Sequence, residues 1–238
     1  NRREIVTKAL DLGINLFDLT IDSEKEAMGR LLKEISPSNE ILIQTRPEGM
    51  VYNYDPANRQ MAQYNLLRAE VERICGLLKR EHVDILNFAF MQAALDADPE
   101  YIQKIGDNIR RLKQEGLIRF AGADTFSGEA TYLEQYRSGH FDVTFINYNL
   151  SDVMMEDLVI PEAAERGMGI LTRETFRKGR LFEMAKEAGI EDRGLVARCA
   201  VKWGLRDPRI TAAVLGVATP GQLESNCEAA QSLQLVDE

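Results

Sequence analysis

The sequence predicts an α/β fold in which a parallel sheet closes into a (β/α)₈ TIM barrel, and three observations support this prediction. The chain has 238 residues, close to the roughly 250 that one such barrel typically needs. Short apolar runs alternate with segments of helical periodicity along the whole sequence, which is typical of parallel strands joined by helices. The chain opens with a helix and holds seven expected strands. We therefore treat residues 1–238 as one barrel domain whose first strand is absent from the sequence; an open, doubly wound sheet is the alternative.

The expected strands are short apolar runs that end on polar residues. They cover residues 14–17, 41–43, 84–91, 118–122, 142–146, 169–171 and 211–215. The expected helices cover residues 2–12, 23–35, 99–116, 158–166 and 219–232, with one ending near residue 81, one near residue 139, and one or two within 177–206.

Local signals mark where two of these helices begin and where one long loop lies. Ser23 with Glu26 three residues later fits a capping box. Thr219 followed by Pro220 fits an N-cap with proline in the first turn. Residues 47–60 contain Pro, Gly, Asn and Asp, and a loop of this length is commonly functional.

Composition excludes several classes of protein. A net charge of −9 and a pI near 5.0 argue against a surface that binds nucleic acid. The three cysteines, Cys75, Cys199 and Cys227, are far apart and form neither a disulfide framework nor a metal-ligand pattern. No apolar run is long enough to cross a membrane, so we expect a cytoplasmic protein without a membrane partner or a bound metal.

Four charged residues end predicted strands and should surround one mouth of the barrel. They are Asp18, Arg46, Asp124 and Arg173. Parallel strands bring their carboxyl ends to one edge of the sheet, where sites of this fold are built. Such a ring can anchor a carboxylate or phosphate, with arginine as a bidentate partner. The alternative is that Asp18 and Arg46 pair with each other as a structural ion pair.

Four stretches resemble the aldo/keto reductase superfamily, and one of them, residues 78–84, resembles the segment before the family's fourth strand. Residues 13–18 read Gly-Ile-Asn-Leu-Phe-Asp, close to the family's Gly-Ile-Asn-Phe-Phe-Asp, and residues 114–122 resemble its Glu-Gly-Lys-Ile-Arg-x-Ile-Gly segment. Residues 216–226 are similar to its final phosphate-binding turn and helix. The resemblance implies a (β/α)₈ barrel that reduces carbonyl compounds with NADPH.

The family uses four catalytic groups, and the resemblance implies that only one is kept here. Asp18 matches the aspartate that ends the second strand, and the loop after it, residues 19–24, holds no tyrosine. Arg46 stands at the position of the lysine and Gln92 at that of the histidine. Arginine stays charged and glutamine does not titrate, so neither replaces the original group in acid–base chemistry. Tyr52 and Tyr54 are alternative acids, or else surface tyrosines of the loop.

The cofactor-binding positions diverge in the same way. Asp124 and Thr125 replace the pair that holds the nicotinamide carboxamide, Phe145 replaces a glutamine and Arg173 replaces a stacking tyrosine. In the last turn and helix, the positions that matter are Gly216 in place of a basic residue, Gln222 in place of an adenine-stacking arginine, and the retained Thr219 and Asn226. NADP(H) is thus the implied cofactor, with an eroded binding motif. Backbone N–H groups at the last helix start can still bind phosphate, or serve only as a cap.

Three functions remain open. The first is an aldo/keto reductase-like oxidoreductase with a diverged site, in which Asp18, Arg46 and Gln92 polarise the carbonyl of a small molecule. The second is a non-redox lyase, epimerase or dehydratase acting on an anionic small molecule. The third is a non-catalytic barrel subunit. The sequence carries no signal of the oligomeric state.

Overall fold

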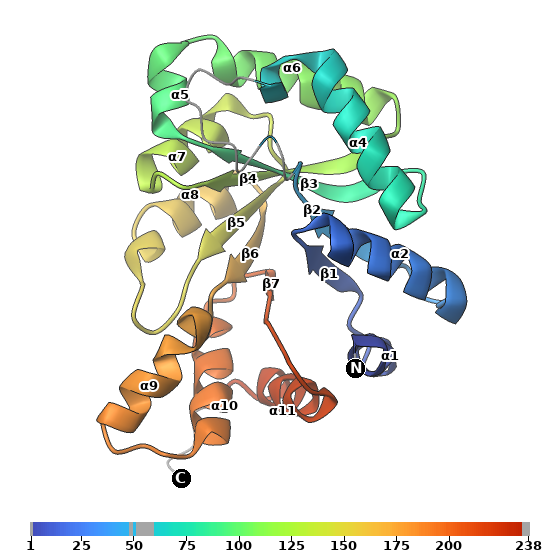
Figure 1. Cartoon of the computed structure of the whole chain (residues 1–238). Coiled ribbons are helices and arrows are strands. Elements are labelled where there is room, and N and C mark those ends of the chain that lie inside the picture. The colour runs from blue at the N-terminus through green and yellow to red at the C-terminus, as the bar shows by residue number, and fades with distance from the viewer. Residues whose placement is uncertain (1, 48–49, 51–59, 235–238) are drawn as a thin grey trace.

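The computed structural model describes residues 2–47, 50 and 60–234. Tyr52 and Tyr54 lie outside these described residues. The first helix, α1 (Arg2–Asp11), ends before the first strand, and the elements then alternate along the chain (Figure 1). In the part of the chain that is described, no helix is both long and apolar enough to span a bilayer.

The strands form one parallel sheet whose spatial order equals the order along the chain. An open doubly wound sheet reverses its strand order part-way across, so this topology excludes that alternative. The described strands are β1 (Leu16–Leu19), β2 (Leu42–Thr45), β3 (Val83–Phe90), β4 (Ile118–Thr125), β5 (Val143–Asn147), β6 (Gly169–Arg173) and β7 (Ala212–Ala213). The sheet curls as a barrel does, with β1 and β7 at its two edges (Figure 1).

Helices cover the outer face of the curled sheet (Figure 1). They are α2 (Asp22–Ile35), α4 (Tyr64–Leu78), α5 (Gln92–Ala97), α6 (Tyr101–Gln114), α7 (Glu129–Ser138), α8 (Val159–Glu165), α9 (Arg180–Glu187), α10 (Arg193–Gly204) and α11 (Pro220–Gln231). Short 3₁₀ turns lie at Gln60–Ala62, Met154–Glu156 and Arg177–Gly179.

Two apolar clusters lie on opposite faces of the sheet. Side chains of a strand alternate between faces, so Leu86 and Phe88 pack outward against the helices, whereas Ile85 points to the inside. The inner cluster consists of Ile85, Val143, Phe145 and Leu171. This small inner cluster fills the bottom of the barrel and leaves the carboxyl ends of the strands to polar residues.

All seven described strands were expected from the sequence, the short helix α5 was not, and several boundaries differ. The predicted capping box at Ser23 is wrong, because α2 already begins at Asp22. Glu24 instead accepts hydrogen bonds from the N–H groups of Thr20 (3.0 Å) and Ile21 (3.3 Å). Strand β7 has two residues rather than five. The start of α11 is confirmed, since the Thr219 hydroxyl accepts the Gln222 N–H at 3.2 Å.

Candidate functional site

A cavity of about 760 Å³ opens at the carboxyl ends of the strands. The sequence-predicted residues Asp18, Arg46, Thr125, Arg173 and Gly216 all line it. Each lies at or just beyond the carboxyl end of a strand of the parallel sheet, which explains why residues far apart in the sequence meet here. The other lining residues that the argument uses are Tyr132, Phe145 and Asn147.

The strongest contact at this mouth is an ion pair between the buried Asp124 and the partly buried Arg173. Both guanidinium Nη atoms donate to the two carboxylate oxygens at 2.8 Å, and the third donor, Nε, reaches the Asn147 side-chain oxygen at 2.7 Å. Asp124 is fully buried. The bidentate geometry fixes the Arg173 guanidinium in one plane and leaves neither oxygen of Asp124 free to act as a base.

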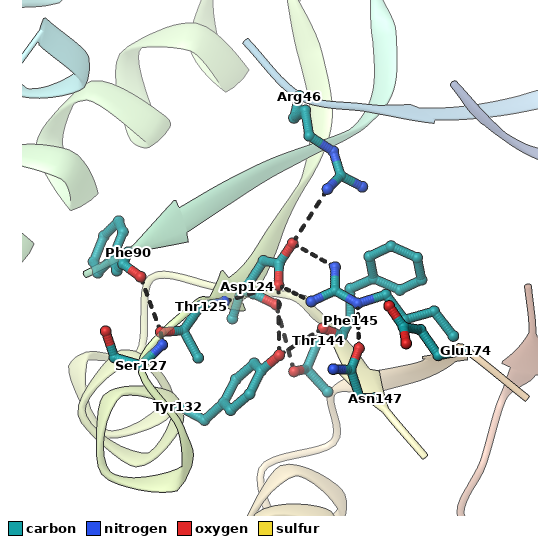
Figure 2. Close-up of polar contacts among 12 residues, drawn as sticks. Arg46, Phe90, Asp124, Thr125, Ser127, Tyr132, Thr144, Phe145, Asn147 and Glu174 are labelled. Atoms are coloured by element: carbon teal, nitrogen blue, oxygen red, sulfur yellow. Dashed lines mark hydrogen bonds and ion pairs between the residues drawn. The ribbon is translucent and has the colours of Figure 1, made fainter. Parts of the chain in front are cut away.

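Arg46 is held more loosely than Arg173. It lies 3.5 Å from Asp18 and 3.7 Å from Asp124, and Figure 2 shows it reaching toward Asp124 from the side opposite Asn147. Its Nε atom is buried without a hydrogen-bond partner. These distances exceed those of strong charge-assisted hydrogen bonds, so Arg46 keeps donor capacity that Arg173 has already used.

Asp18 is largely buried, and its neighbours compensate its negative charge only in part. Gln44 donates to it at 3.1 Å. Burial raises the pKa of Asp18 above its ordinary value, and the nearby Arg46 guanidinium and the Gln44 hydrogen bond oppose that shift without cancelling it. The carboxyl group therefore holds a proton at higher pH than an exposed aspartate does.

Tyr132, on α7, is a lining residue that sequence reasoning missed. Its hydroxyl donates to the Phe145 carbonyl at 2.8 Å and lies 3.5 Å from Asp124 (Figure 2). Burial, reinforced by the charge of Asp124, raises the pKa of this phenol well above its ordinary value. A helix residue facing the sheet carries no distinctive sequence signal, because the same spacing describes any core tyrosine.

A second cavity of about 320 Å³ meets the first at Gly216. The predicted cofactor residues Gln222 and Asn226 line it, together with Arg193, which sequence reasoning did not single out. Thr219 is not a lining residue; its hydroxyl caps the N-terminus of α11. Among the described residues, no group of three or more His, Cys, Asp or Glu side chains is placed to hold a metal ion.

The sequence model of the aldo/keto reductase family matches residues 1–194. The chain belongs to this family. As an aldo/keto reductase it is 24% identical to L-galactose dehydrogenase of Arabidopsis thaliana, over 96% of the chain and 77% of that protein. It is also 24% identical to L-glyceraldehyde 3-phosphate reductase of Escherichia coli O157:H7, over 98% of the chain and 80% of that protein.

The fold agrees with this family assignment. The holo form of aldo-keto reductase AKR11C1 from Bacillus halodurans superposes with a TM-score of 0.76 at 20% identity, covering 98% of this chain and 82% of that one. The seven described strands of this aldo/keto reductase thus form most of a (β/α)₈ barrel.

Gln92 is the one predicted catalytic residue that this aldo/keto reductase does not bring to the mouth. Strand β3 ends at Phe90, and Gln92 begins the unpredicted helix α5, which turns its side chain outward. There its amide hydrogen-bonds Asp96 (3.0 Å), Glu134 (3.1 Å) and the Thr131 hydroxyl (2.7 Å). Gln92 therefore ties α5 to α7 and does not line either cavity.

Proposed function

We propose that this chain is a nicotinamide-dependent oxidoreductase that interconverts a small carbonyl compound and its alcohol, with a substrate-side cluster unlike the family's usual four groups. The observation that carries the proposal is the pair of cavities joined at Gly216, within a barrel of the aldo/keto reductase family. Cavities that bind small molecules typically measure about 300–1,000 Å³, and both fall in that range.

The residues present are compatible with a nicotinamide cofactor lying across both cavities. The Arg173–Asp124 pair is charge-neutral and planar, so it offers a surface on which a flat ring can stack. Gln222 and Asn226 supply polar groups in the second cavity. When bound, the cofactor would donate or accept the hydride; the remaining roles fall to the side chains around the first cavity.

Arg46 and Asp18 are the side chains we assign to the substrate. A guanidinium with spare donors can hold and polarise a carbonyl oxygen, and Arg46 has that capacity. Burial raises the pKa of Asp18, the direction that favours a proton donor at a reacting oxygen. Gln92 has no part in this chemistry because it faces α7.

We also propose that the substrate carries a carboxylate or phosphate. Arg46 is buried and its contacts with Asp18 and Asp124 are long, so an anion entering the cavity would gain a stronger hydrogen-bonded pair. The similarity to a reductase named for L-glyceraldehyde 3-phosphate is in keeping with this substrate class.

Calorimetric titration with NADPH and NADH, followed by a panel of neutral and anionic aldehydes monitored by nicotinamide absorbance, tests the proposal. We expect cofactor binding and turnover, with anionic aldehydes preferred. Arg46→Gln should lower turnover at least about tenfold, the loss of one charged hydrogen bond, while Gln92→Ala should not. Absence of binding of either cofactor at millimolar concentration would overturn the proposal.

A second candidate is a non-redox enzyme acting on an anionic small molecule. It is favoured by the position of the Arg173–Asp124 pair, which fills the place where the family resemblance expects contacts with the nicotinamide. Since both oxygens of Asp124 are engaged, Asp18 would be the base and Arg46 the anchor. Turnover of an anionic substrate without any change in nicotinamide absorbance would favour this candidate.

A further inference from the structure

Gln44 is a fully buried amide on β2 that lies directly beside Asp18. The two residues are register partners in the parallel pair of β1 and β2, and the Gln44 Nε2 atom donates to Oδ1 of Asp18 at 3.1 Å. Among the residues the structure describes, no other side chain hydrogen-bonds Asp18, and Arg46 lies 3.5 Å from the same oxygen. Gln44 and Arg46 therefore hold Asp18 through one oxygen only.

Packing does not account for a glutamine at position 44. Its side-chain oxygen is buried without a hydrogen-bond partner. A buried polar atom without a partner is costly, whereas an apolar side chain of similar length carries no such cost. In the described part of the chain, the hydrogen bond to Asp18 is the one that the Gln44 side chain makes, so this bond is what the amide supplies.

The second oxygen of Asp18, Oδ2, makes no hydrogen bond with any described residue. The Asp18 side chain is 17% exposed and lines the cavity at the barrel mouth. Gln44 and Arg46 are both N–H donors, so the oxygen they approach is the acceptor and is a poor place for a proton. A proton on Asp18 therefore belongs on Oδ2.

We propose that Gln44 is a positioning residue that keeps the proton of Asp18 on Oδ2, the oxygen left for the substrate. This inference rests on the proposed function, in which Asp18 protonates the reacting oxygen. As the proton passes from Oδ2 to the carbonyl oxygen, the carbonyl carbon takes the hydride from the cofactor and Asp18 becomes a carboxylate. The Gln44 N–H then stabilises that carboxylate, because a hydrogen bond to the charged form favours it.

The other charges that face Asp18 stay in place when only residue 44 is changed. Burial raises the pKa of Asp18, Arg46, the Gln44 hydrogen bond and Arg173 lower it, and Asp124 raises it. The cavity of about 530 Å³ that Asp18 lines together with α1 and α2 brings five more charged side chains, which are Arg2, Arg3, Glu24, Arg30 and Glu34. A difference between a Gln44 variant and wild type therefore reports the loss of the amide.

A carboxyl ¹³C NMR titration of the whole chain measures the pKa of Asp18 without turnover, and the loss of its signal in Asp18→Asn assigns it. Gln44→Met removes the donor and keeps the side-chain length, so the titration midpoint should move to higher pH by at least about 0.5, a roughly threefold change in the acid dissociation constant. Gln44→Leu, which removes the donor with a different shape, should move the midpoint in the same direction.

Thr45→Val is the matched control on the same strand. The buried Thr45 hydroxyl donates to the Leu19 carbonyl at 2.6 Å, and its side chain lies on the opposite face of β2 from Gln44. This variant also loses a buried hydrogen bond, so it should lower the free energy of unfolding while leaving the Asp18 midpoint unchanged. A role of Gln44 in stability alone would make the variants at 44 behave in the same way.

The pH profile of turnover should follow the titration. An acid with a higher pKa is a weaker proton donor, so Gln44→Met should lower kcat for an aldehyde at least about threefold and shift the alkaline limb of its pH profile to higher pH. KM should change less than about twofold, because Arg46 and not Gln44 is assigned to hold the substrate.

Three outcomes would overturn the inference and leave the oxidoreductase proposal standing. They are equal midpoints for wild type and both Gln44 variants, a midpoint that moves equally in Thr45→Val, and a shifted titration with an unshifted kcat profile. No calorimetric binding of NADPH or NADH would instead overturn the proposed function, and the role of Gln44 in proton transfer with it, whatever the midpoints.

Discussion

Asp124 is a buried carboxylate at the barrel mouth whose negative charge must be compensated by neighbouring side chains. It is fully buried and lies between two guanidinium groups, at 2.8 Å from Arg173 and 3.7 Å from Arg46. A buried pair adds little net stability relative to apolar side chains, yet breaking it leaves a charge without compensation. The cost of substitution here therefore depends on whether one partner or both are changed.

Asp124→Ala should lower the free energy of unfolding by about 3 kcal/mol, because the partly buried Arg173 is left without its partner. Urea denaturation measures this change. Replacing both partners, as Asp124→Leu with Arg173→Met, should recover most of the loss. Arg3→Ala, which breaks an exposed pair with Glu34, is the control and should cost less than about 1 kcal/mol. Equal losses for Asp124→Ala and Arg3→Ala would contradict the prediction.

Asp18 should make stability decrease as pH rises. Burial raises its pKa above the ordinary value of 3.8, so between that value and the raised pKa the folded chain binds more protons than the unfolded chain. The free energy of unfolding then falls with increasing pH across this interval. Asp18→Asn removes the titration, so its stability relative to wild type should rise across the interval and level off above it.

Urea unfolding of wild type and Asp18→Asn at a series of pH values tests this sign. Asp107→Asn provides a control of opposite sign, because the Arg110 hydrogen bond lowers the pKa of Asp107. That variant should lose stability relative to wild type as pH rises. A difference between Asp18→Asn and wild type that does not vary with pH would refute the assignment.

At the scale of elements, α2 crosses close over the end of α4, backbone against backbone. Gly29 of α2 lies so near that a Cβ built there would be 2.4 Å from the Leu77 carbonyl oxygen and 2.7 Å from the backbone of Leu78. Backbone atoms cannot rotate away as a side chain would. The packing of these two helices therefore requires glycine at this position.

Gly29→Ala should lower the stability of the fold by about 1–3 kcal/mol, the usual cost of overpacking. Gly76→Ala, in α4 of the same helix pair, should act in the opposite direction. A Cβ there meets nothing within 4 Å, and alanine is favoured over glycine inside a helix by about 0.5–1 kcal/mol. Thermal unfolding of the two variants should give midpoints on opposite sides of wild type; two midpoints shifted in the same direction would show that the crossing is not as close as described.

At the scale of the whole molecule, the strands of the sheet differ in burial and in the number of strands they pair with. Strand β3 is buried along its entire length and pairs with β4 over seven register positions. Strands β1 and β7 lie at the edges, and each pairs with one described neighbour only. Backbone hydrogen bonds that are exposed and lightly packed open most easily.

Hydrogen exchange followed by mass spectrometry should reveal this gradient. We expect the slowest exchange in peptides covering β3 and β4, and faster exchange in peptides covering β1 and β7. A uniform rate in all strands would mean that the sheet opens only as one cooperative unit.

The parallel strand order also determines which site residues can be predicted from the sequence. Parallel strands share one carboxyl edge, so Asp18, Arg46, Asp124 and Arg173 could be brought together from the sequence alone. The Asp18–Arg46 ion pair, which neighbouring strands suggested, is present at 3.5 Å. The partner of Arg173 could not be predicted in the same way, because it depends on the curl of the sheet: Arg173 reaches Asp124 across β5, over the Phe145 ring at 4.7 Å.

Gln92 and Arg193 show two other limits of prediction from sequence. Gln92 matched a family position by register, but the six-residue helix α5 that redirects it has too little periodicity to be recognised. Arg193 reads as an ordinary first residue of a helix. That Arg193 stacks on Phe182 and lines the second cavity follows only from the folded chain.

The Arg173–Asp124 pair also has an evolutionary consequence. An arginine buried at 173 without an acid at 124 would be destabilising, as would the acid without the arginine, so the two substitutions depend strongly on each other. The order in which they arose is therefore constrained, and close homologues should carry both residues or neither. The same coupling means that a family-like tyrosine at 173 would be tolerated only in a chain that has also lost the aspartate.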